Sequence, residues 1–273
     1  MYILSNPHTH TKYCDGSNTP EEMVRSAIDI GFHTLGFSGH SYMPFDPEIG
    51  MSLEETESYI KEINALKEKY RGQIDIILGI EEDYYSDIEL APYEYVIGSF
   101  HYFRDKDGKY YAVDNTVSEM KDCINNVFGG RPMDMVKHYY EQVVNVVMQR
   151  KPDILGHFDL VRKLNKNDCL FSENSPEYHK IALDALEACA ASGCIFEVNT
   201  GAMSRGYTDT PYPSFFLLKR LAQLKAPVII SSDTHSVQTI DFYFKETVTL
   251  LKEAGFKSIR ELCSGGFREI PFV

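Results

Sequence analysis

Two pairs of potential metal ligands stand near the two ends of the chain. His8 and His10 form the motif HTH, and Asp233 and His235 close the motif SDTH. In extended backbone, residues two apart project to the same side, so each pair can present two ligands to one metal ion or to neighbouring ions. Imidazole and carboxylate without thiolate favour zinc, manganese or iron over calcium or an iron–sulfur cluster. The spacing therefore predicts a metal site.

Further histidines and carboxylates follow short apolar runs along the chain. The candidates outside the two pairs are Asp15, His40, Glu81, His101 and His157. A lone histidine is more often a hydrogen-bonded or solvent-facing side chain than a ligand, and we keep that interpretation for His33, His138 and His179. Nine ligand-type residues at corresponding places of successive elements would require many coincidences. The set as a whole predicts a metal centre.

The apolar runs that precede these residues have the character of buried parallel strands. They are short, rich in β-branched residues, and alternate with longer amphipathic stretches. We expect strands near 2–6 and at 34–38, 74–80, 95–100, 154–158, 194–198 and 228–232. Helix starts are indicated at Thr19-Pro20-Glu21-Glu22 and at Ser52, where a capping residue precedes an acidic first turn. The pattern predicts repeated βα units.

The repeated βα units predict an α/β fold, a distorted (β/α)7 TIM-like barrel, as a single domain over residues 1–273. A length of 273 residues is ordinary for one such barrel, which commonly has about 250. No glycine-rich phosphate loop or nucleotide fingerprint follows a strand, which disfavours an open nucleotide-binding sheet. Barrel enzymes assemble their sites at the carboxyl ends of strands, where these ligands fall. The polar segment 103–131 is expected to be an insertion over that face.

Composition and net charge limit the kinds of molecule that the chain is expected to bind. Hydrophobic residues make up 43% and charged residues 25%, which indicates a packed globular core. A net charge of -13 would repel a polyanion, so we expect a small-molecule substrate and no nucleic-acid partner. The six cysteines lack a C-x-x-C pair, and the chain has no signal segment and no run of 18 apolar residues. These features predict reduced thiols, a cytoplasmic location and no membrane contact; the oligomeric state is left open.

In their order along the chain, these motifs resemble the polymerase and histidinol phosphatase (PHP) family. The motifs are HTH, Asp15-Gly16, FSGH, Glu81, GSFH, GHFD and SDTH, and they span nearly the whole chain. The combination of GSFH with LGHFDLVRK is similar to the monofunctional histidinol-phosphate phosphatases of that family. The resemblance implies hydrolysis of L-histidinol phosphate to L-histidinol and phosphate in histidine biosynthesis. One departure is Gly39, where many members have Asp; it concerns a hydrogen bond behind the ligand and not the ligand itself.

The resemblance also implies three divalent metal ions, of zinc, manganese or iron. The implied ligands are His8, His10, Glu81 and Asp233 for the first ion, Glu81, His101 and His157 for the second, and Asp15, His40 and His235 for the third. A hydroxide that bridges two ions would attack the phosphoryl group, and Glu81, Asp233 and His235 would be the catalytic side chains. No serine or cysteine nucleophile is expected.

Substrate contacts are predicted at four further residues. Arg162 and Arg205 follow predicted strands and could present a fork of donors to phosphate oxygens, although a surface role is equally open for Arg205 and favoured for Arg162. Glu197 and Asn199 stand two apart on one predicted strand. They could face the substrate's amine or imidazole, or serve the barrel interior.

Two other functions stay open. A PHP-family phosphodiesterase or 3'-5' exonuclease would use the same metals on nucleotides, but the 27 Lys and Arg residues do not cluster into a strand-binding groove. A non-catalytic metal-binding protein is the alternative of a different class. Structural zinc sites are usually closed, cysteine-rich sets of four ligands, which disfavours it.

Overall fold

The computed structural model describes residues 3–272, and parallel strands form the wall of a barrel-like sheet within them. These strands are β1 Ser5–Asn6, β2 Thr34–Phe37, β3 Asp75–Asp83, β4 Tyr95–Ser99, β7 Ile154–Leu155, β8 Ile195–Asn199 and β9 Val228–Ser231. They pair in that order, each parallel to the next. The seven expected strands are confirmed to within a few residues, except that Tyr2 of the first lies outside the described residues.

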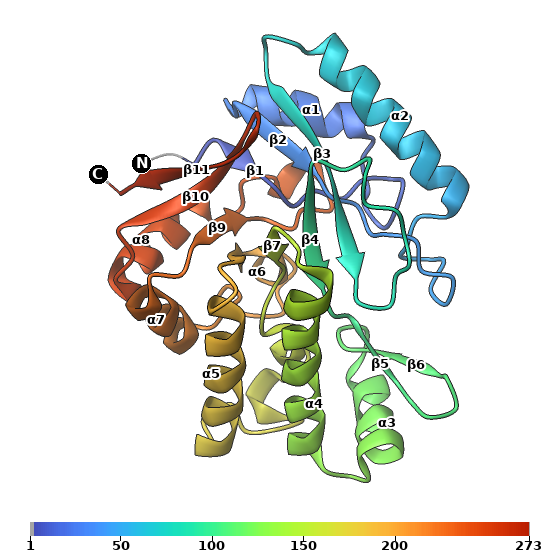
Figure 1. Ribbon diagram of the computed structural model, residues 1–273, viewed down its shortest axis with the longest axis vertical. Coiled ribbons are helices and arrows are strands. Elements are labelled where there is room, and N and C mark those ends of the chain that lie inside the picture. Colours follow the sequence, from blue (N-terminus) through green and yellow to red (C-terminus); the bar gives the residue numbers. More distant parts are fainter. Residues whose placement is uncertain (1–2, 273) are drawn as a thin grey trace.

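The sheet closes differently at its two ends. At the carboxyl end, Thr9 after β1 bridges Thr234 after β9. At the other end, β10 (Ser258–Cys263) pairs in parallel with β9, contacts β1, and forms an antiparallel hairpin with β11 (Gly266–Pro271). Figure 1 shows this hairpin in red beside both termini. The distorted (β/α)7 fold is confirmed, but sequence reasoning missed the hairpin, whose signal was Ser264-Gly265-Gly266 between two strand-like runs.

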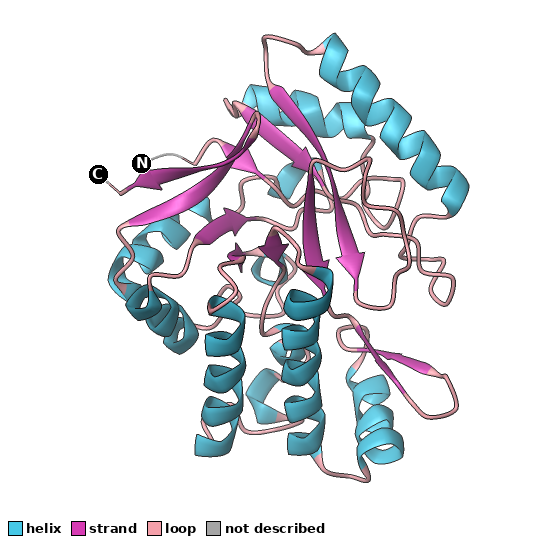
Figure 2. Cartoon of the chain, viewed as in Figure 1, coloured by secondary structure: helices cyan, strands magenta, loops and turns pink. Residues whose placement is uncertain are grey.

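Helices pack around the sheet and, at one end, extend beyond it (Figures 1 and 2). They are α1 Pro20–Asp29, α2 Leu53–Lys69, α3 Val117–Phe128, α4 Pro132–Asn145, α5 Pro176–Ala190, α6 Gly201–Ser204, α7 Phe215–Leu224 and α8 Phe244–Ala254. A π-helical turn, Val146–Arg150, continues α4, and 3₁₀ turns occupy Leu160–Arg162, Lys166–Asp168 and Val237–Thr239. Capping boxes at Thr19 and Ser52 confirm the two expected helix starts. Within residues 3–272, no helix combines the length and apolar character needed to span a membrane.

A small apolar cluster fills the lower interior of the barrel. Its members are Ile77, Tyr95, Ile97, Ile154, Ile229 and Leu262, the last contributed by the C-terminal hairpin. The ring of Tyr95 passes so close to Gly36 and Gly79 that a Cβ atom at either position would overlap it. This end of the barrel interior is therefore filled with apolar side chains.

The loops after β2 and β4 are tied together at the barrel mouth. After β4, the strands β5 (Tyr102–Arg104) and β6 (Tyr110–Ala112) form a hairpin that leads into α3, within the segment expected to be an insertion. Phe45, from the loop after β2, stacks on Tyr110 with ring centroids 3.8 Å apart. The Tyr102 hydroxyl donates a 2.7 Å hydrogen bond to Asp46 of the same loop. These contacts build one wall over the carboxyl end of the barrel.

Candidate metal centre

The nine predicted ligands gather at the carboxyl end of the barrel strands. His8 and His10 follow β1, His40 follows β2, His101 follows β4, His157 follows β7, and Asp233 and His235 follow β9. Asp15 lies in the same loop as the first pair. Glu81 lies inside β3, which continues two residues beyond it, rather than at the strand end as expected. Parallel strands place all their carboxyl ends on one rim, which is why residues far apart in sequence meet there.

Glu81 lies at the centre of the cluster and is only 1% exposed. One of its oxygens, Oε2, lies 3.2 Å from His8 Nε2, 3.6 Å from His10 Nε2 and 3.1 Å from His40 Nδ1. Three imidazoles from two separate loops therefore converge on a single carboxylate oxygen.

The other oxygen of Glu81, Oε1, faces a second pair of imidazoles. It lies 2.9 Å from His157 Nε2 and 3.4 Å from His101 Nε2, and accepts a 2.7 Å hydrogen bond from Ser99. The two Nε2 atoms of His101 and His157 are 3.2 Å apart. Two nitrogens bound to one tetrahedral zinc ion at about 2.0–2.1 Å lie roughly 3.3 Å from each other. The spacing of this pair fits ligands of a shared cation.

Three groups of ligand atoms are compact enough to hold an ion, with all atoms of a group within 4.8 Å of one another. The groups are His8, His10 and Asp233; His40, Glu81 and His101; and His10, Asp15, His40 and His235. They resemble the three implied ligand sets. The differences are that Glu81 is absent from the first group, that His40 stands where His157 was expected in the second, and that His10 is shared with the third.

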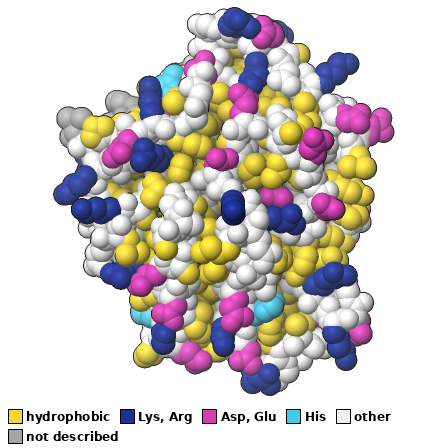
Figure 3. Space-filling model, in the orientation of Figure 1, with side chains coloured by type: hydrophobic (Ala, Val, Ile, Leu, Met, Phe, Trp, Pro, Cys, Tyr) yellow, Lys and Arg dark blue, Asp and Glu magenta, His cyan; other side chains and the backbone are white. Residues whose placement is uncertain are grey.

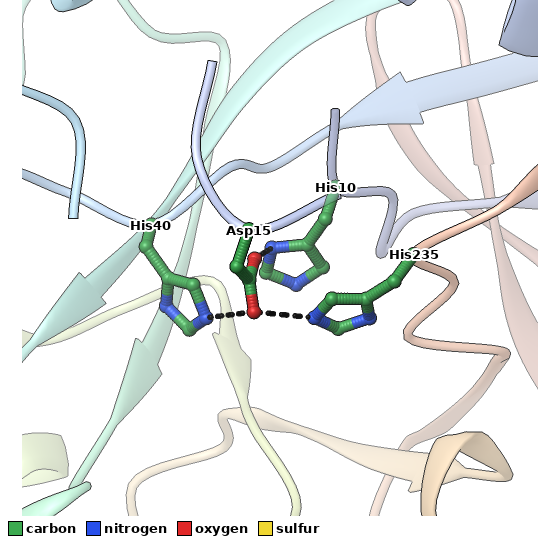
Figure 4. A group of neighbouring side chains, drawn as sticks. All are labelled: His10, Asp15, His40 and His235. Carbon is green, nitrogen blue, oxygen red and sulfur yellow. Dashed lines mark hydrogen bonds and ion pairs between the residues drawn. The ribbon is translucent and has the colours of Figure 1, made fainter. Parts of the chain in front are cut away.

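Asp15 connects the third group, which Figure 4 shows. Its Oδ2 atom lies 2.9 Å from His235 Nε2 and 3.8 Å from His40 Nε2, while Oδ1 lies 3.4 Å from His10 Nδ1. The three histidines come from the loops after β9, β2 and β1. One short carboxylate thus joins three loops at the rim.

Some nitrogen and oxygen atoms of the predicted ligands are buried without a hydrogen-bond partner, and their positions indicate whether cations fit this cluster. Among the described residues, His8 Nε2, His10 Nε2 and Asp15 Oδ1 are buried and have no hydrogen-bond partner. Leaving such an atom unsatisfied costs about 1–3 kcal/mol. Both Nε2 atoms face the carboxylates of Glu81 and Asp233 at 3.2–3.7 Å. A divalent cation between these atoms would satisfy them all, so the donor set fits metal binding.

The charges of the cluster are strongly coupled. Burial opposes protonation of His8, but Glu197, Glu81 and Asp233 beside it raise its pKa to about 10. Burial would raise the pKa of Glu81, yet His8 and His40 hold it well below its usual range. A protonated His8 thus offsets part of this negative charge, whereas burial lowers the pKa of His40 to about 4 and keeps that ring neutral. Metal ions would supply positive charge to the cluster by displacing protons such as that of His8.

Glu197 lies behind the ligands and does not face the cavity. It is fully buried, with Oε1 2.5 Å from His8 Nδ1 and Oε2 accepting a 2.7 Å hydrogen bond from the His157 amide. Asn199, also buried, donates to the same carboxylate at 3.0 Å. A carboxylate on one imidazole nitrogen fixes the tautomer that presents the other nitrogen to a metal. Of the two roles left open by the sequence, the contacts of Glu197 and Asn199 therefore favour a role inside the barrel over a contact with substrate.

Replacing Glu197 by glutamine should lower kcat/KM about 10–100-fold, with a matching loss of metal affinity, because the amide carries no charge to hold His8. Steady-state kinetics and competition with a zinc-binding dye measure the two effects. Glu187→Gln is the matched control, since Glu187 pairs with Arg220 on the surface. Unchanged metal affinity in Glu197→Gln would contradict the positioning role.

Two supporting residues were missed by sequence reasoning. Asp83, two residues after Glu81 on the same side of β3, lies 3.3 Å from His101 Nδ1 and accepts a 3.0 Å hydrogen bond from the His101 amide. Gly201 backs Asp233, because a Cβ at position 201 would lie 2.8 Å from that side chain. Strand alternation could have indicated Asp83. We find no sequence signal for Gly201.

The space beside Gly39, the departure from the family pattern, is filled by Cys14. A Cβ at position 39 would lie 3.2 Å from Cys14 Sγ. This sulfur lies 3.5 Å from His10 Nδ1, on the side of the ring away from Glu81. Cys14 therefore contacts His10, a predicted ligand, and occupies the space that a side chain at position 39 would enter.

Arg205, one of the two arginines predicted to bind phosphate, lines the cavity above the ligands. Its Nη1 donates to the Asp233 carbonyl at 3.1 Å, and its Nη2 lies 3.2 Å from Asp233 Oδ2. Nη1 also lies 3.0 Å from His235 Nδ1. The guanidinium is thus held against the rim of the cluster, where it can donate to an oxygen of a bound phosphoester.

Arg162, the other arginine, does not line the cavity. Its guanidinium is buried in ion pairs with Asp159 at 3.1 Å and Glu173 at 2.6 Å. The 3₁₀ turn that contains Arg162 directs the next residue, Lys163, into the cavity wall instead. The position of Arg162 gives no support to a substrate contact, because both carboxylates already use its donors.

A cavity of about 650 Å³ opens over the cluster. The ligands on its floor are Asp15, His40, Glu81, His101, His157, Asp233 and His235. Its outer wall comes from the loop after β2, the β5–β6 hairpin and the start of α3. Volumes of roughly 300–1,000 Å³ are typical of sites for small molecules.

A seven-strand α/β barrel with buried histidines and carboxylates at the floor of a cavity has the architecture of a metallohydrolase. The chain belongs to the PHP domain family, whose sequence profile matches residues 6–201. The resemblance drawn from its motifs is thereby confirmed.

Curated relatives extend over nearly the whole chain. A probable histidinol-phosphatase of Deinococcus radiodurans is 29% identical, covering 95% of this chain and 96% of its own. A histidinol-phosphatase of Bacillus subtilis is 28% identical, covering 87% and 96%. The crystal structure of a Lactococcus lactis histidinol phosphate phosphatase, in complex with zinc, L-histidinol and phosphate, superposes with a TM-score of 0.71 at 21% identity, covering 97% and 99%. At that identity the structural match shows the shared fold.

Proposed function

We propose that this chain is a metal-dependent phosphatase that hydrolyses L-histidinol phosphate to L-histidinol and phosphate, a step of histidine biosynthesis in the cytoplasm. The observation that carries the proposal is the set of three ligand groups on the floor of a cavity suited to a small phosphoester. The curated relatives named histidinol-phosphatase support the choice of substrate.

We assign three divalent cations to the cluster; because a neutral imidazole has one nitrogen free to bind a metal, His10 and His40, which each belong to two of the groups, would each bind one cation only. Zinc, manganese or iron suits a set of imidazoles and carboxylates. Such ions supply a water molecule of lowered pKa and positive charge for the phosphoryl oxygens. Glu81 keeps neighbouring ligand groups at a fixed separation, because its two oxygens face different histidines.

The residues at the cavity surface have the remaining roles. Arg205 and Lys163 both line the cavity and can orient the phosphoryl oxygens. Asp233 and His235 have side chains that are 10% and 24% exposed, so both reach the space where the attacking water and the leaving oxygen must exchange protons. We therefore retain Asp233 and His235, with Glu81, as the catalytic side chains.

Phosphate release by the purified protein, loaded with zinc or manganese, tests this function. The substrates are histidinol phosphate, p-nitrophenyl phosphate, AMP and a short oligonucleotide. We expect kcat/KM for histidinol phosphate to exceed the others by at least about 100-fold, or about 2.7 kcal/mol at the transition state. His101→Ala should be inactive, whereas His179→Ala should not, because His179 stacks on Phe216 away from the cluster.

The other possible results separate the alternative functions. Preference for the oligonucleotide would favour an exonuclease, although on the face in Figure 3 the Lys and Arg side chains are interspersed with Asp and Glu. Single-stranded and double-stranded nucleic acids usually bind along a surface rich in Lys and Arg. No turnover of any phosphoester with any metal would favour a metal-binding protein without catalytic activity.

A further inference from the structure

The outer wall of the cavity is rich in carboxylates. Those beyond the metal-binding groups are Asp46, Glu48, Asp114 and Glu119. The cationic residues that line the cavity are Lys163 and Arg205, and Arg205 is paired with Asp233 at the cluster. The outer wall of the cavity therefore carries net negative charge, which favours a ligand with a cationic group.

Most of these carboxylates already have partners. Asp114 accepts a 2.7 Å ion pair from Lys163, which lowers the pKa of Asp114 to about 2 against the effect of burial. Glu119 accepts the amide of Ala112 at 2.8 Å through one oxygen and Asn115 at 2.9 Å through the other. Glu48 is exposed at the rim.

Asp46 is different, because among the described residues the one side chain that donates a hydrogen bond to its carboxylate is neutral. The Tyr102 hydroxyl donates to its Oδ2 atom at 2.7 Å, and Tyr102 itself is 5% exposed. Within residues 3–272 no lysine, arginine or histidine forms an ion pair with Asp46. The stack of Phe45 on Tyr110 holds the backbone beside it. The carboxylate is thus fixed at the cavity wall with its charge uncompensated and one oxygen available.

We propose that Asp46 binds the ammonium group of the leaving alcohol and so selects amine-bearing phosphomonoesters. This inference rests on the proposed function, in which the leaving alcohol is an amino alcohol. A primary ammonium is charged at neutral pH and donates to a carboxylate without further reorganisation. An alcohol without the amine leaves the half-buried carboxylate unpaired, and sites with unpaired polar groups discriminate strongly against such analogues.

A cycle of two enzymes and two substrates tests the proposal. The enzymes are wild type and Asp46→Asn. The substrates are histidinol phosphate and 3-(imidazol-4-yl)propyl phosphate, which differs from histidinol phosphate only by lacking the amino group. We expect the wild type to prefer the amine-bearing ester by at least about 30-fold in kcat/KM, or about 2 kcal/mol. In Asp46→Asn the preference should fall below about threefold, because the amide has lost the charge.

Two further variants test whether the effect is specific to the carboxylate of Asp46. Asp107→Asn removes the same charge from the exposed turn of the β5–β6 hairpin, outside the cavity, and should retain the wild-type preference. Tyr102→Phe keeps the charge of Asp46 but removes the hydrogen bond that fixes it, so its preference should fall less than in Asp46→Asn.

The outcomes separate this inference from the function on which it rests. Equal losses on both substrates in Asp46→Asn, or a wild type that turns over both without preference, would overturn the role of Asp46 alone. A larger loss of preference in Tyr102→Phe than in Asp46→Asn would also overturn it. If the wild type hydrolyses neither substrate but does hydrolyse another phosphoester, the proposed function fails and the inference fails with it.

Discussion

Replacing Glu81 by glutamine is expected to reduce kcat/KM at least about 1,000-fold, which corresponds to about 4 kcal/mol at the transition state. The two oxygens of Glu81 face five imidazoles, so no other side chain touches as much of the cluster. Glutamine has a single acceptor oxygen, no charge, and an NH₂ group that would point its donors at histidine nitrogens. The metal content per chain, measured by plasma mass spectrometry, should fall in parallel with activity.

The neighbouring residue provides a matched control for this prediction. Glu82 is 2% exposed and points to the opposite side of β3, where Arg150 lies 3.6 Å away. Burial raises the pKa of Glu82 and so favours its neutral form, which a glutamine resembles. Glu81, in contrast, is held in its charged form by the histidines around it. Glu82→Gln should therefore keep its metal and its activity within about threefold of wild type. Comparable losses in the two variants would indicate a general effect on β3 and not a specific role of Glu81.

Removing the metal with a chelator is expected to abolish activity and to lower the melting temperature by at least about 5 °C. A ligand present at about 1,000 times its Kd stabilises the folded chain by about 4 kcal/mol, and in a domain of this size each kcal/mol changes Tm by roughly 2 °C. Without a cation, His8 Nε2, His10 Nε2 and Asp15 Oδ1 stay buried without a hydrogen-bond partner. Differential scanning fluorimetry and phosphate release measure the two effects.

Readdition of zinc or manganese should restore both the activity and the melting temperature. The Glu81→Gln variant is a control for side effects of the chelator, because it should already have lost most of its metal and should show a smaller decrease in Tm. Full activity in protein stripped below about one tenth of an ion per chain would contradict a metal-dependent mechanism.

The location of the ligand set was predictable from sequence because two local rules suffice. Short β-branched runs identify buried parallel strands, and all parallel strands end on the same rim. His101 after the run 95–100 and His157 within the run 154–158 needed no knowledge of their partners to be placed there. The starts of α1 and α2 were predictable for the same reason, since Thr19 and Ser52 cap their helices through residues three positions away.

The direction of side chains near the rim was not predictable in the same way. Arg162 and Lys163 are adjacent in the chain, and only the carboxylates of Asp159 and Glu173 decide that the arginine is buried. The sequence left open whether Glu197 faces a substrate or the barrel interior, because its partner His8 comes from the other end of the chain. Local patterns contain no information about which distant group compensates a buried charge.

The sequence by itself therefore determined the parallel βα architecture, the candidate ligands and the end of the barrel at which they meet. Only the tertiary structure decided how Glu81 divides five histidines between its two oxygens. It also decided that Glu197 supports His8 from behind and that Asp46 meets Tyr102, 56 residues away, at the cavity wall. The physical reason is that strand periodicity acts over a few residues, whereas the pairing of buried charges depends on closure of the whole barrel.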